Sequence, residues 1–392
     1  GKSGRRVKHW LAAGQTESAL EPLLQEVHRR DRYGDYARLV HLLELRSTLL
    51  DRIGAAPEDP RRLENRLERQ RPRIRNGEFE RAAEQLREVI EWAEVGGQTE
   101  LMAKAGEMLG RTEFEAGRIA EARQALERAI DWAIEAGSRA IEGRACNTMV
   151  DVEMRVGELD RAEDYVGRAV ELLEGREHLQ ALERRATLTL YRGDHQEARE
   201  LFDELTERAR SRGDRLIEGH ATNHLGELDR MAGRWAEARE KYGAFRRINL
   251  AFGNRVEVAI ADLNLAQVGL GERAWSTAED HLERTRRELG RLGIVEHFTA
   301  ILELISLVLA AGRGDWGSVD LLFDGLSGRW EGEEPLEPDY PQLLSMAGAE
   351  AERSGEGEWA SRLWGLAARL WRRLDYVAEA EALEERLAGL AR

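Results

Sequence analysis

Glycine followed five residues later by alanine recurs along this 392-residue chain at a nearly constant interval, which restricts the fold more than any other feature. From the first of five such pairs, the steps between successive glycines are 40, 40, 36 and 40 residues. A fixed period of this length is typical of proteins that stack one supersecondary unit on the next. The pairs are Gly77/Ala82, Gly117/Ala122, Gly157/Ala162, Gly193/Ala198 and Gly233/Ala238, with degenerate copies at Arg273/Ala278, Gly314/Val319 and Gly357/Arg362.

A second set of glycines keeps the same interval about half a period away. Glycine suits the left-handed residue that closes a helix, where a Cβ would clash. Two glycines per period therefore predict two helices per unit, each of ~15–18 residues, a normal globular length. Abundant Arg, Glu, Ala and Leu, with little strand-like alternation, predict an all-α chain. The second set is Gly97, Gly137, Gly175, Gly213, Gly253 and Gly293.

The stretch GRWAEAREKY (Gly233–Tyr242) shows how one unit is expected to pack. Gly233 makes the corner between two helices, Ala238 lets the partner backbone approach closely, and Tyr242 lies one turn further on the same face. Six of the ten tryptophans also recur at fixed places in the unit, which favours packing over a ligand cage, whereas Trp364 and Trp371 lie outside these places. Those two past the corner are Trp235, Trp275, Trp316 and Trp359, and those near the end of the second helix are Trp92 and Trp132.

These units resemble the tetratricopeptide repeat. In ATNHLGELDRMAGRWAEAREKY (Ala221–Tyr242), the pair Leu225-Gly226 matches the first helix of the family, and Gly233, Ala238 and Tyr242 match its turn and second helix. The units are about 40 residues long and lack a closing proline, which is similar to the repeats of kinesin light chain and of spindle-orientation adaptors. One departure is that acids fill the family's first-helix tyrosine position, at Glu113, Glu153 and Asp229.

The resemblance implies a right-handed superhelical solenoid of helical hairpins with a concave face. We expect irregular helices continuous with the array at residues 1–76, repeats at 77–374, and a C-terminal capping helix at 375–392. The segment Glu331–Gln342 holds three of the seven prolines and is predicted to be a loop. The segment Arg5–Leu24 resembles the helical region after the core of signal-transduction ATPases, and of kinases fused to such arrays. Because the chain begins with Gly1, we expect it to be part of a larger protein, with a kinase or ATPase domain upstream.

The charge balance restricts the partners. The formal net charge is −15, from 74 acids and 59 bases, which argues against nucleic acid and favours a basic or neutral ligand. The lone Cys146, expected to be buried, is typical of a reducing compartment, so we expect a cytoplasmic protein. The apolar run Phe298–Gly312 is too short to span a membrane. It predicts either a helix buried on several sides or a self-association surface.

No pattern points to chemistry. GKSG (Gly1–Gly4) lacks the upstream glycine and strand of a phosphate-binding loop. His220 and His224 share one side of a helix but have no third ligand nearby in the sequence, as a zinc site would need. The arginine-rich segment Arg61–Arg75 is interpreted as a solvated helix face rather than a phosphate patch. We therefore predict no enzyme, no cofactor and no metal.

The leading hypothesis is a non-enzymatic scaffold that binds a protein or peptide segment on its concave face. Arg and Asn at such positions suit hydrogen bonds to an extended ligand. Three alternatives are that the same residues are ordinary polar surface, that the array is an effector-sensing module of a larger kinase or ATPase, and that it is a hydrolase. Carried over from the family's first-helix positions, the ligand-facing residues are Lys104, Arg111, Arg144, Asn147, Asp151, Arg155, Gln180, Glu183, His220, Asn223, Glu227 and Arg230.

Overall fold

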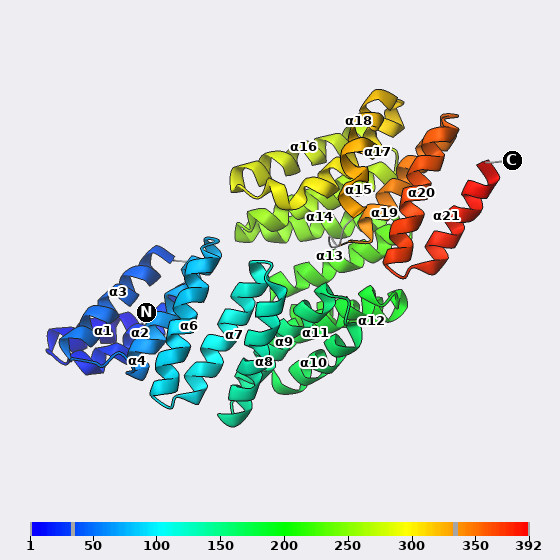
Figure 1. Ribbon diagram of the computed structural model, residues 1–392. Helices are drawn as coiled ribbons and strands as arrows, with labels where there is room; N and C mark the ends of the chain where they lie inside the picture. Colours follow the sequence, from blue (N-terminus) through cyan, green and yellow to red (C-terminus); the bar gives the residue numbers. More distant parts are fainter. Residues whose placement is uncertain (1, 33–35, 332–335, 391–392) are drawn as a thin grey trace. The chain divides into compact units, whose positions relative to one another are not determined.

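The computed structural model describes residues 2–32, 36–331 and 336–390, and these residues form helices and turns without any strand (Figure 1). The predicted all-α solenoid of stacked hairpins is confirmed, because successive helices pack against one another. The chain divides into two compact units, Gly1–Arg192 and Gly193–Arg392. No described helix is both long and apolar enough to cross a lipid bilayer.

The α-helices of the two units range from 6 to 18 residues in length. In the first unit they are α1 (Lys2–Ala12), α2 (Thr16–Arg32), α3 (Tyr36–Arg52), α4 (Pro60–Glu68), α5 (Gln70–Arg75), α6 (Phe79–Val95), α7 (Thr99–Glu115), α8 (Ile119–Glu135), α9 (Arg139–Arg155), α10 (Leu159–Leu172) and α11 (Gly175–Tyr191). In the second they are α12 (His195–Arg212), α13 (Arg215–Met231), α14 (Trp235–Phe252), α15 (Arg255–Gly271), α16 (Trp275–Leu292), α17 (Thr299–Arg313), α18 (Trp316–Ser327), α19 (Asp339–Arg353), α20 (Gly357–Arg373) and α21 (Val377–Leu390), with short 3-10 helices η1 (Val295–Phe298) and η2 (Arg329–Glu331).

The periodic glycines occupy left-handed backbone at the helix boundaries, as predicted. In the two regular sets, φ lies between 63° at Gly97 and 84° at Gly193. The degenerate copy at Arg273 keeps the same conformation with φ of 58°, although it carries a side chain. The last copy was assigned wrongly: the left-handed residue is Gly355, and Ala360 follows it by five residues with no exposed surface. Trp359 therefore lies four residues past its corner, not two.

The single 36-residue step comes from one short helix. Helix α10 has 14 residues, whereas its counterpart α8 has 17. The chain after α10 is extended at Leu173, and Gly175 begins α11 instead of closing α10. One turn of helix is thus missing from this repeat, but the repeat still forms a helical hairpin.

Small residues set the distance between the helices of a hairpin. A Cβ added to Gly269 would lie 3.0 Å from the Cβ of Ala278, so the two backbones approach closely. The tryptophans two past the corner pack against the following first helix: a Cβ on Gly271 would lie 2.5 Å from the Trp235 indole. In the next repeat, a Cβ on Gly312 would lie 2.6 Å from the Trp275 indole. These tryptophans therefore act in packing, as their fixed spacing predicts.

The acids at the family's tyrosine position are buried and held by cations. Glu113 accepts hydrogen bonds from Arg87 on the preceding helix, at 2.5 Å, and from Arg118 in the next turn. Glu153 and Asp229, at the equivalent positions, are held in the same way. Glu153 pairs with Arg123 and Arg161, and Asp229 pairs with Arg199, Arg234 and Lys241. The buried ion pairs thus occupy the place of an aromatic side chain at the hairpin junction.

The described residues before Gly77 form helices α1 to α5, with one break in the arginine-rich segment. The predicted helix Arg61–Arg75 divides into α4 and α5 at Arg69. The ring of Pro72 in α5 would clash with the carbonyl of Glu68, the residue at which α4 ends. The predicted loop Glu331–Gln342 is wrong at its end, because α19 begins at Asp339. Pro341 is tolerated there, because the backbone N–H groups in the first turn of a helix have no intrahelical hydrogen bond to lose.

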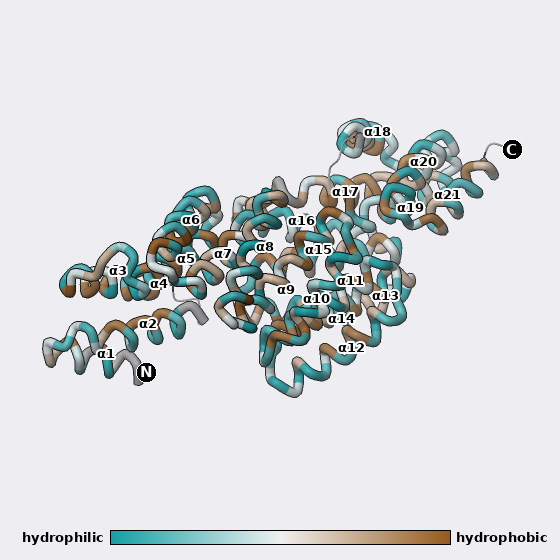
Figure 2. Tube along the Cα trace, turned by 60° about the horizontal axis from the view of Figure 1, so that its bottom comes forward, coloured by the Kyte–Doolittle hydropathy of each residue, from teal (hydrophilic) through white to brown (hydrophobic). Residues whose placement is uncertain are grey.

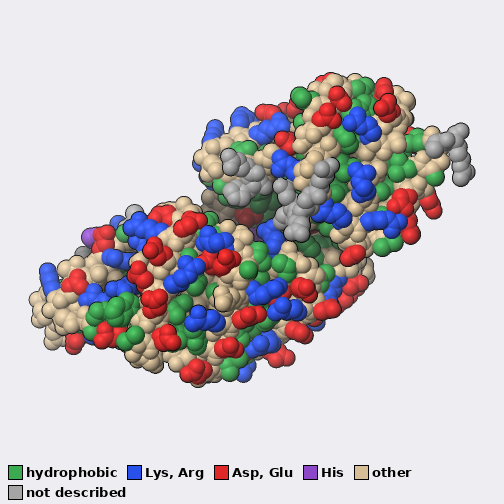
Figure 3. Space-filling view, viewed as in Figure 1, with side chains coloured by type: hydrophobic (Ala, Val, Ile, Leu, Met, Phe, Trp, Pro, Cys, Tyr) green, Lys and Arg blue, Asp and Glu red, His purple; other side chains and the backbone are tan. Residues whose placement is uncertain are grey.

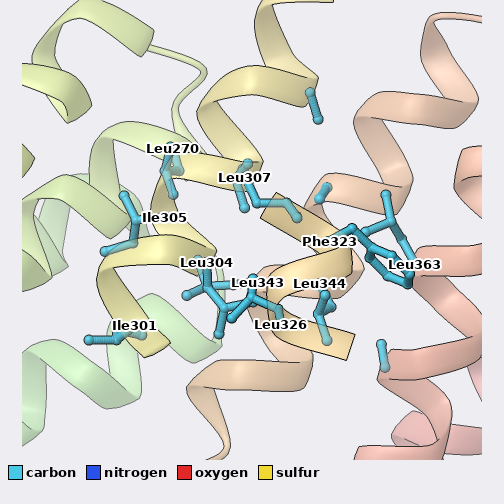
Figure 4. Close-up of a cluster of buried hydrophobic side chains, with 14 of the residues drawn as sticks. Leu270, Ile301, Leu304, Ile305, Leu307, Phe323, Leu326, Leu343, Leu344 and Leu363 are labelled. Carbon is cyan, nitrogen blue, oxygen red and sulfur yellow. The ribbon is translucent and has the colours of Figure 1, made fainter. Parts of the chain in front are cut away.

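Helix α17 is the most apolar helix of the second unit, and it lies inside that unit's core. Figure 2 shows hydrophobic and hydrophilic residues alternating along most helices, and α17 is an exception. Leu304 and Leu307 on α17 have no exposed surface, and their side chains lie among Leu343, Leu326 and Phe323 from α19 and α18 (Figure 4). The sequence left open burial or self-association for this helix, and the structure shows burial.

Candidate functional site

The first unit contains a cavity of about 610 Å³ on the side formed by the first helices of its repeats. Helices α7, α9 and α11 contact one another and supply one wall, and α2, α4 and α5 supply the other. Lys104 and Arg111 face it from α7 because two helical turns separate them. The lining residues are Leu24, His28, Glu64, Leu67, Glu68, Arg71, Lys104, Glu107, Met108, Arg111, Arg144 and Glu177.

The wall formed by α2, α4 and α5 carries a buried ion pair network. The Glu68 carboxylate pairs with His28 at 3.3 Å and accepts a hydrogen bond from Nε of Arg71 at 2.8 Å. Burial would raise the pKa of Glu68, but the hydrogen bond from His28 and the charge of Arg71 outweigh it and hold the pKa below its ordinary value. Glu68 is therefore ionised and already satisfied.

Three residues predicted to face a ligand come together in this cavity. Lys104 and Arg111 belong to α7, and Arg144 occupies on α9 the position that Lys104 has on α7, 40 residues earlier. Lys104 Nζ lies 2.8 Å from Glu100, and Arg144 lies 3.5 Å from Glu177. Both side chains are about one-third exposed, so these pairs are weak and can exchange for ligand groups.

The other predicted residues of this unit lie outside the cavity lining. Asn147 is 8% exposed, and its Oδ1 has no hydrogen-bond donor among the described residues. Asp151 forms a fork with Arg184 at 2.7–3.0 Å, and burial raises the pKa of Asp151 despite that guanidinium. The remaining three are Arg155, whose guanidinium lies 6.0 Å from the Phe114 ring, and the partly exposed Gln180 and Glu183 on α11.

The four predicted residues of the second unit lie on α13 and have partners within that unit. His220 contacts Phe245 edge-on with ring centres 6.0 Å apart, and Asn223 Oδ1 accepts from Asn264 at 3.0 Å. Glu227 accepts from His224, which stacks on Phe202 of α12 at 4.7 Å. Burial would raise the pKa of Glu227, but that hydrogen bond lowers it. The two histidines of the i, i+4 pair therefore contact rings on different helices.

Arg230, the fourth of these residues, is an internal connection. It is 3% exposed and donates to Asp339 and Gln342 of α19, both at 2.5 Å, and to the Tyr242 hydroxyl at 3.3 Å. These contacts raise the pKa of Arg230 although burial opposes them. Its guanidinium has no free face for a ligand, and its position in α13 alone gives no sign of this.

The sequence did not identify several cavity residues. Glu107 is three residues after Lys104 and four before Arg111, a spacing that places all three on one helix face. That spacing could have identified Glu107. His28, Glu68 and Arg71 come from the N-terminal helices, whose repeat phase the sequence does not reveal. Arg71 lines the cavity, whereas Arg61 and Arg62 form ion pairs with Asp59 and Asp51.

Two smaller cavities lie among the described residues of the second unit. One, of about 460 Å³, lies beside α12 and the start of α19, and none of the predicted residues lines it. The other, of about 330 Å³, is lined by five arginines of α14, α15 and α16, of which Arg246 pairs with Asp262 and Arg255 with Glu288. Figure 3 shows basic and acidic side chains interspersed over the visible surface, so such local pairing is general. We therefore take the cavity of the first unit as the candidate site.

Comparison with known proteins identifies the repeat. Residues 177–248 match the model of the family described as Tetratricopeptide repeat. No curated protein matches the sequence significantly. Among solved structures, the chain is similar to a Rap protein complexed with Competence and Sporulation Factor, with a TM-score of 0.61 at 16% identity over 95% of this chain and 97% of that one.

Two further structures have similar folds. The apo form of the quorum sensor NprR from B. thuringiensis gives a TM-score of 0.55 at 13% identity, covering 96% of this chain and 99% of that one. Aspartyl phosphate phosphatase F from Bacillus subtilis gives 0.53 at 13% identity, covering 95% and 94%. At such identities the likeness concerns the fold. Residues 177–248 therefore match tetratricopeptide repeats, and the chain has the helical-repeat fold of these solved structures.

Proposed function

We propose that the chain is a binding scaffold that holds a short peptide, or an extended protein segment, in the cavity of its first unit. The observation that carries this proposal is the gathering of Lys104, Arg111 and Arg144, from two successive repeats, on one wall of one cavity. Its volume of about 610 Å³ is within the range of sites that enclose drug-sized ligands.

The lining suits a peptide in its chemistry. The Arg and Lys side chains can donate hydrogen bonds to carbonyl and carboxylate oxygens, and Arg can do so in a bidentate manner. Leu24, Leu67 and Met108 supply an apolar floor.

The similar structures support a recognition role. One is a Rap protein bound to Competence and Sporulation Factor, and another is a quorum sensor. The latter favours a regulatory form of the same proposal, in which the array senses an effector for another domain, such as a fused kinase or ATPase. The fold also occurs in a phosphatase. We nevertheless propose binding without catalysis, because the sequence offers no nucleophile with a base beside it. We also propose a cytoplasmic location, because the lone Cys146 is typical of a reducing compartment.

The test is selection of ligands from a synthetic pentapeptide library by the immobilised chain. We expect the wild type to retain a defined subset of peptides, because the cavity is largely preformed. The double substitution Arg111→Ala/Arg144→Ala should weaken retention at least about tenfold, since each lost charge-assisted hydrogen bond contributes about 1.5–3 kcal/mol.

The control is Arg81→Ala/Arg139→Ala, which removes two exposed arginines outside the cavity. It should retain the same peptides as the wild type, and circular dichroism should show equal helicity for all three proteins. If the cavity variant retained its peptides unchanged, the site would lie elsewhere. If the wild type retained none, the proposed function would be wrong.

A further inference from the structure

Glu107 lines the cavity of the first unit, and its carboxylate faces the cavity without a partner among the described residues. The residue is 6% exposed, and among the described residues its side chain makes no hydrogen bond or ion pair. The contrast with the neighbouring acids is clear. Glu68 on the opposite wall has two partners, and Glu113 on the same helix has two arginines.

The cations nearest in sequence do not pair with Glu107. Lys104, one turn before it, lies 2.8 Å from Glu100 on the side away from Glu107 along the helix. Arg111, one turn after it, lines the cavity and makes no hydrogen bond or ion pair among the described residues. An i, i+4 pair between Glu107 and Arg111 would be normal on a helix surface. Here both side chains keep their charges available to the cavity.

A carboxylate that faces a cavity and has no partner within the chain is available to pair with a ligand cation. We propose that Glu107 is the anchor for a cationic group of the bound ligand, an ammonium or guanidinium on an aliphatic stem. This inference rests on the proposed function and names the chemical class of its ligand. A charge-assisted hydrogen bond between such a cation and the Glu107 carboxylate would be stronger than one between neutral groups.

The surroundings of Glu107 fit such a group. Met108, the next residue, and Leu67 on the facing wall are buried and apolar, and can cover the stem. Arg111 can bind a carboxylate of the same ligand, so that the charges of Glu107 and Arg111 are both neutralised. The net charge of −15 makes the chain a better partner for basic than for acidic peptides. At the equivalent position of the next repeat stands Asn147, an acceptor without charge.

The cation can come from a lysine or arginine side chain or from a peptide N-terminus, and two libraries separate these sources. In an N-acetylated pentapeptide library the cation is on side chains alone, whereas in a free-amine library lacking Lys and Arg it is at the N-terminus alone. In one of these two libraries, we expect the wild type to retain cationic peptides at least about tenfold more strongly than neutral peptides of the same length. Glu107→Gln should lose this preference and Glu107→Asp should keep part of it.

Glu121→Gln is the matched control, because it removes the same charge from an exposed position on α8 outside the cavity. It should keep the preference of the wild type. The inference is overturned if Glu107→Gln still prefers cationic peptides, or if the wild type retains peptides with no such preference. The second result leaves the proposed function standing, whereas retention of no peptide from either library removes both.

Thermal unfolding gives an independent readout. Because the Glu107 carboxylate faces the cavity and has no partner among the described residues, Glu107→Gln should leave the midpoint temperature unchanged or raise it slightly. A structural carboxylate would behave in the opposite way. A lower midpoint, or a variant that fails to fold, would mean that Glu107 has a stabilising partner within the chain and would overturn the proposal.

Discussion

In three repeats, a single buried acid (Glu113, Glu153 or Asp229) connects successive helices at the position where a tetratricopeptide repeat is expected to carry tyrosine. Asp229 is 2% exposed and accepts from Arg199 at 2.7 Å, Arg234 at 2.9 Å and Lys241 at 2.5 Å. These three cations come from the preceding helix, the turn and the following helix. One carboxylate thus fixes the arrangement of three segments, in place of the packing that an aromatic ring would provide.

The pH dependence of the second unit should follow from Asp229. Burial raises its pKa, but hydrogen bonds from Lys241 and Arg234 outweigh burial, so the folded-state pKa is below the ordinary value of 3.8. A depressed carboxyl pKa stabilises the fold above the unfolded pKa, and this stabilisation is lost as the pH falls from about 4 through the folded pKa. Asp229→Asn should therefore lower the free energy of unfolding by about 2 kcal/mol at pH 7 and by much less at low pH.

Urea denaturation at both pH values, followed by hydrogen exchange in α13, measures this difference. The control is Asp203→Asn, an exposed carboxylate on α12, which should change stability little at either pH. An equal loss for Asp229→Asn at both pH values would contradict the assignment, because the loss would then not depend on ionisation.

At the scale of elements, contact distances depend on individual glycines. Helices α19 and α20 pack where Gly348 faces Trp364, which is fully buried and donates from Nε1 to the carbonyl of Ser345 at 3.1 Å. A Cβ on Gly348 would lie 2.4 Å from the indole, which is a clash. Gly365, also within α20, has no neighbour nearer than 4.0 Å for such an atom.

The two glycines should therefore respond oppositely to the same substitution. Gly348→Ala should destabilise the second unit by about 1–3 kcal/mol, because the overfilled contact forces the helices apart. Gly365→Ala should stabilise it by up to about 1 kcal/mol, because alanine favours helix and fills open space. Thermal unfolding of both variants tests the pair, and a similar response at both sites would show that the α19–α20 contact is not tight.

Helix α17 shows the same dependence of an element on its surroundings. Its sequence, apolar almost all round, is compatible with a buried helix and with an exposed contact surface. Leu304 and Leu307 are buried because α15, α18 and α19 surround α17 within the second unit. The contacts of other helices, and not the helix's own pattern, decide between the two.

At the scale of the whole molecule, the candidate site belongs to one of the two units. All cavity residues lie between Leu24 and Glu177, inside Gly1–Arg192. The boundary falls at Gly193, the corner between α11 and α12. Repeat arrays are stabilised mainly by contacts between neighbouring repeats. The determinants of binding and those of the second unit's core are therefore separate in the sequence.

A fragment of residues 1–192 should retain the peptide selection of the full chain. We expect its affinity to be within about threefold, since an unchanged set of lining contacts gives an unchanged binding free energy apart from small losses in rigidity. Circular dichroism should first establish that the fragment is helical, and fluorescence anisotropy with a selected peptide then measures affinity. A helical fragment that does not bind would show that the second unit contributes to the site.

The sequence by itself determined the all-α repeat, its period, its corners and the packing role of the tryptophans at Trp235 and Trp275. These are local properties: a left-handed residue needs glycine, and a close helix contact needs alanine, so spacing alone reveals them. The error at Gly357 arose because two glycines lie two residues apart, at Gly355 and Gly357, and either could hold the corner.

The tertiary structure alone decided which polar residues have partners. Arg230 and Glu107 look alike in the sequence, as charged residues on the first helix of a repeat. Arg230 meets Asp339, 109 residues later, whereas Glu107 meets no partner among the described residues. Ionic pairing of this kind depends on distances of a few ångströms between helices that are remote in the chain, and a periodic pattern carries no information about such distances.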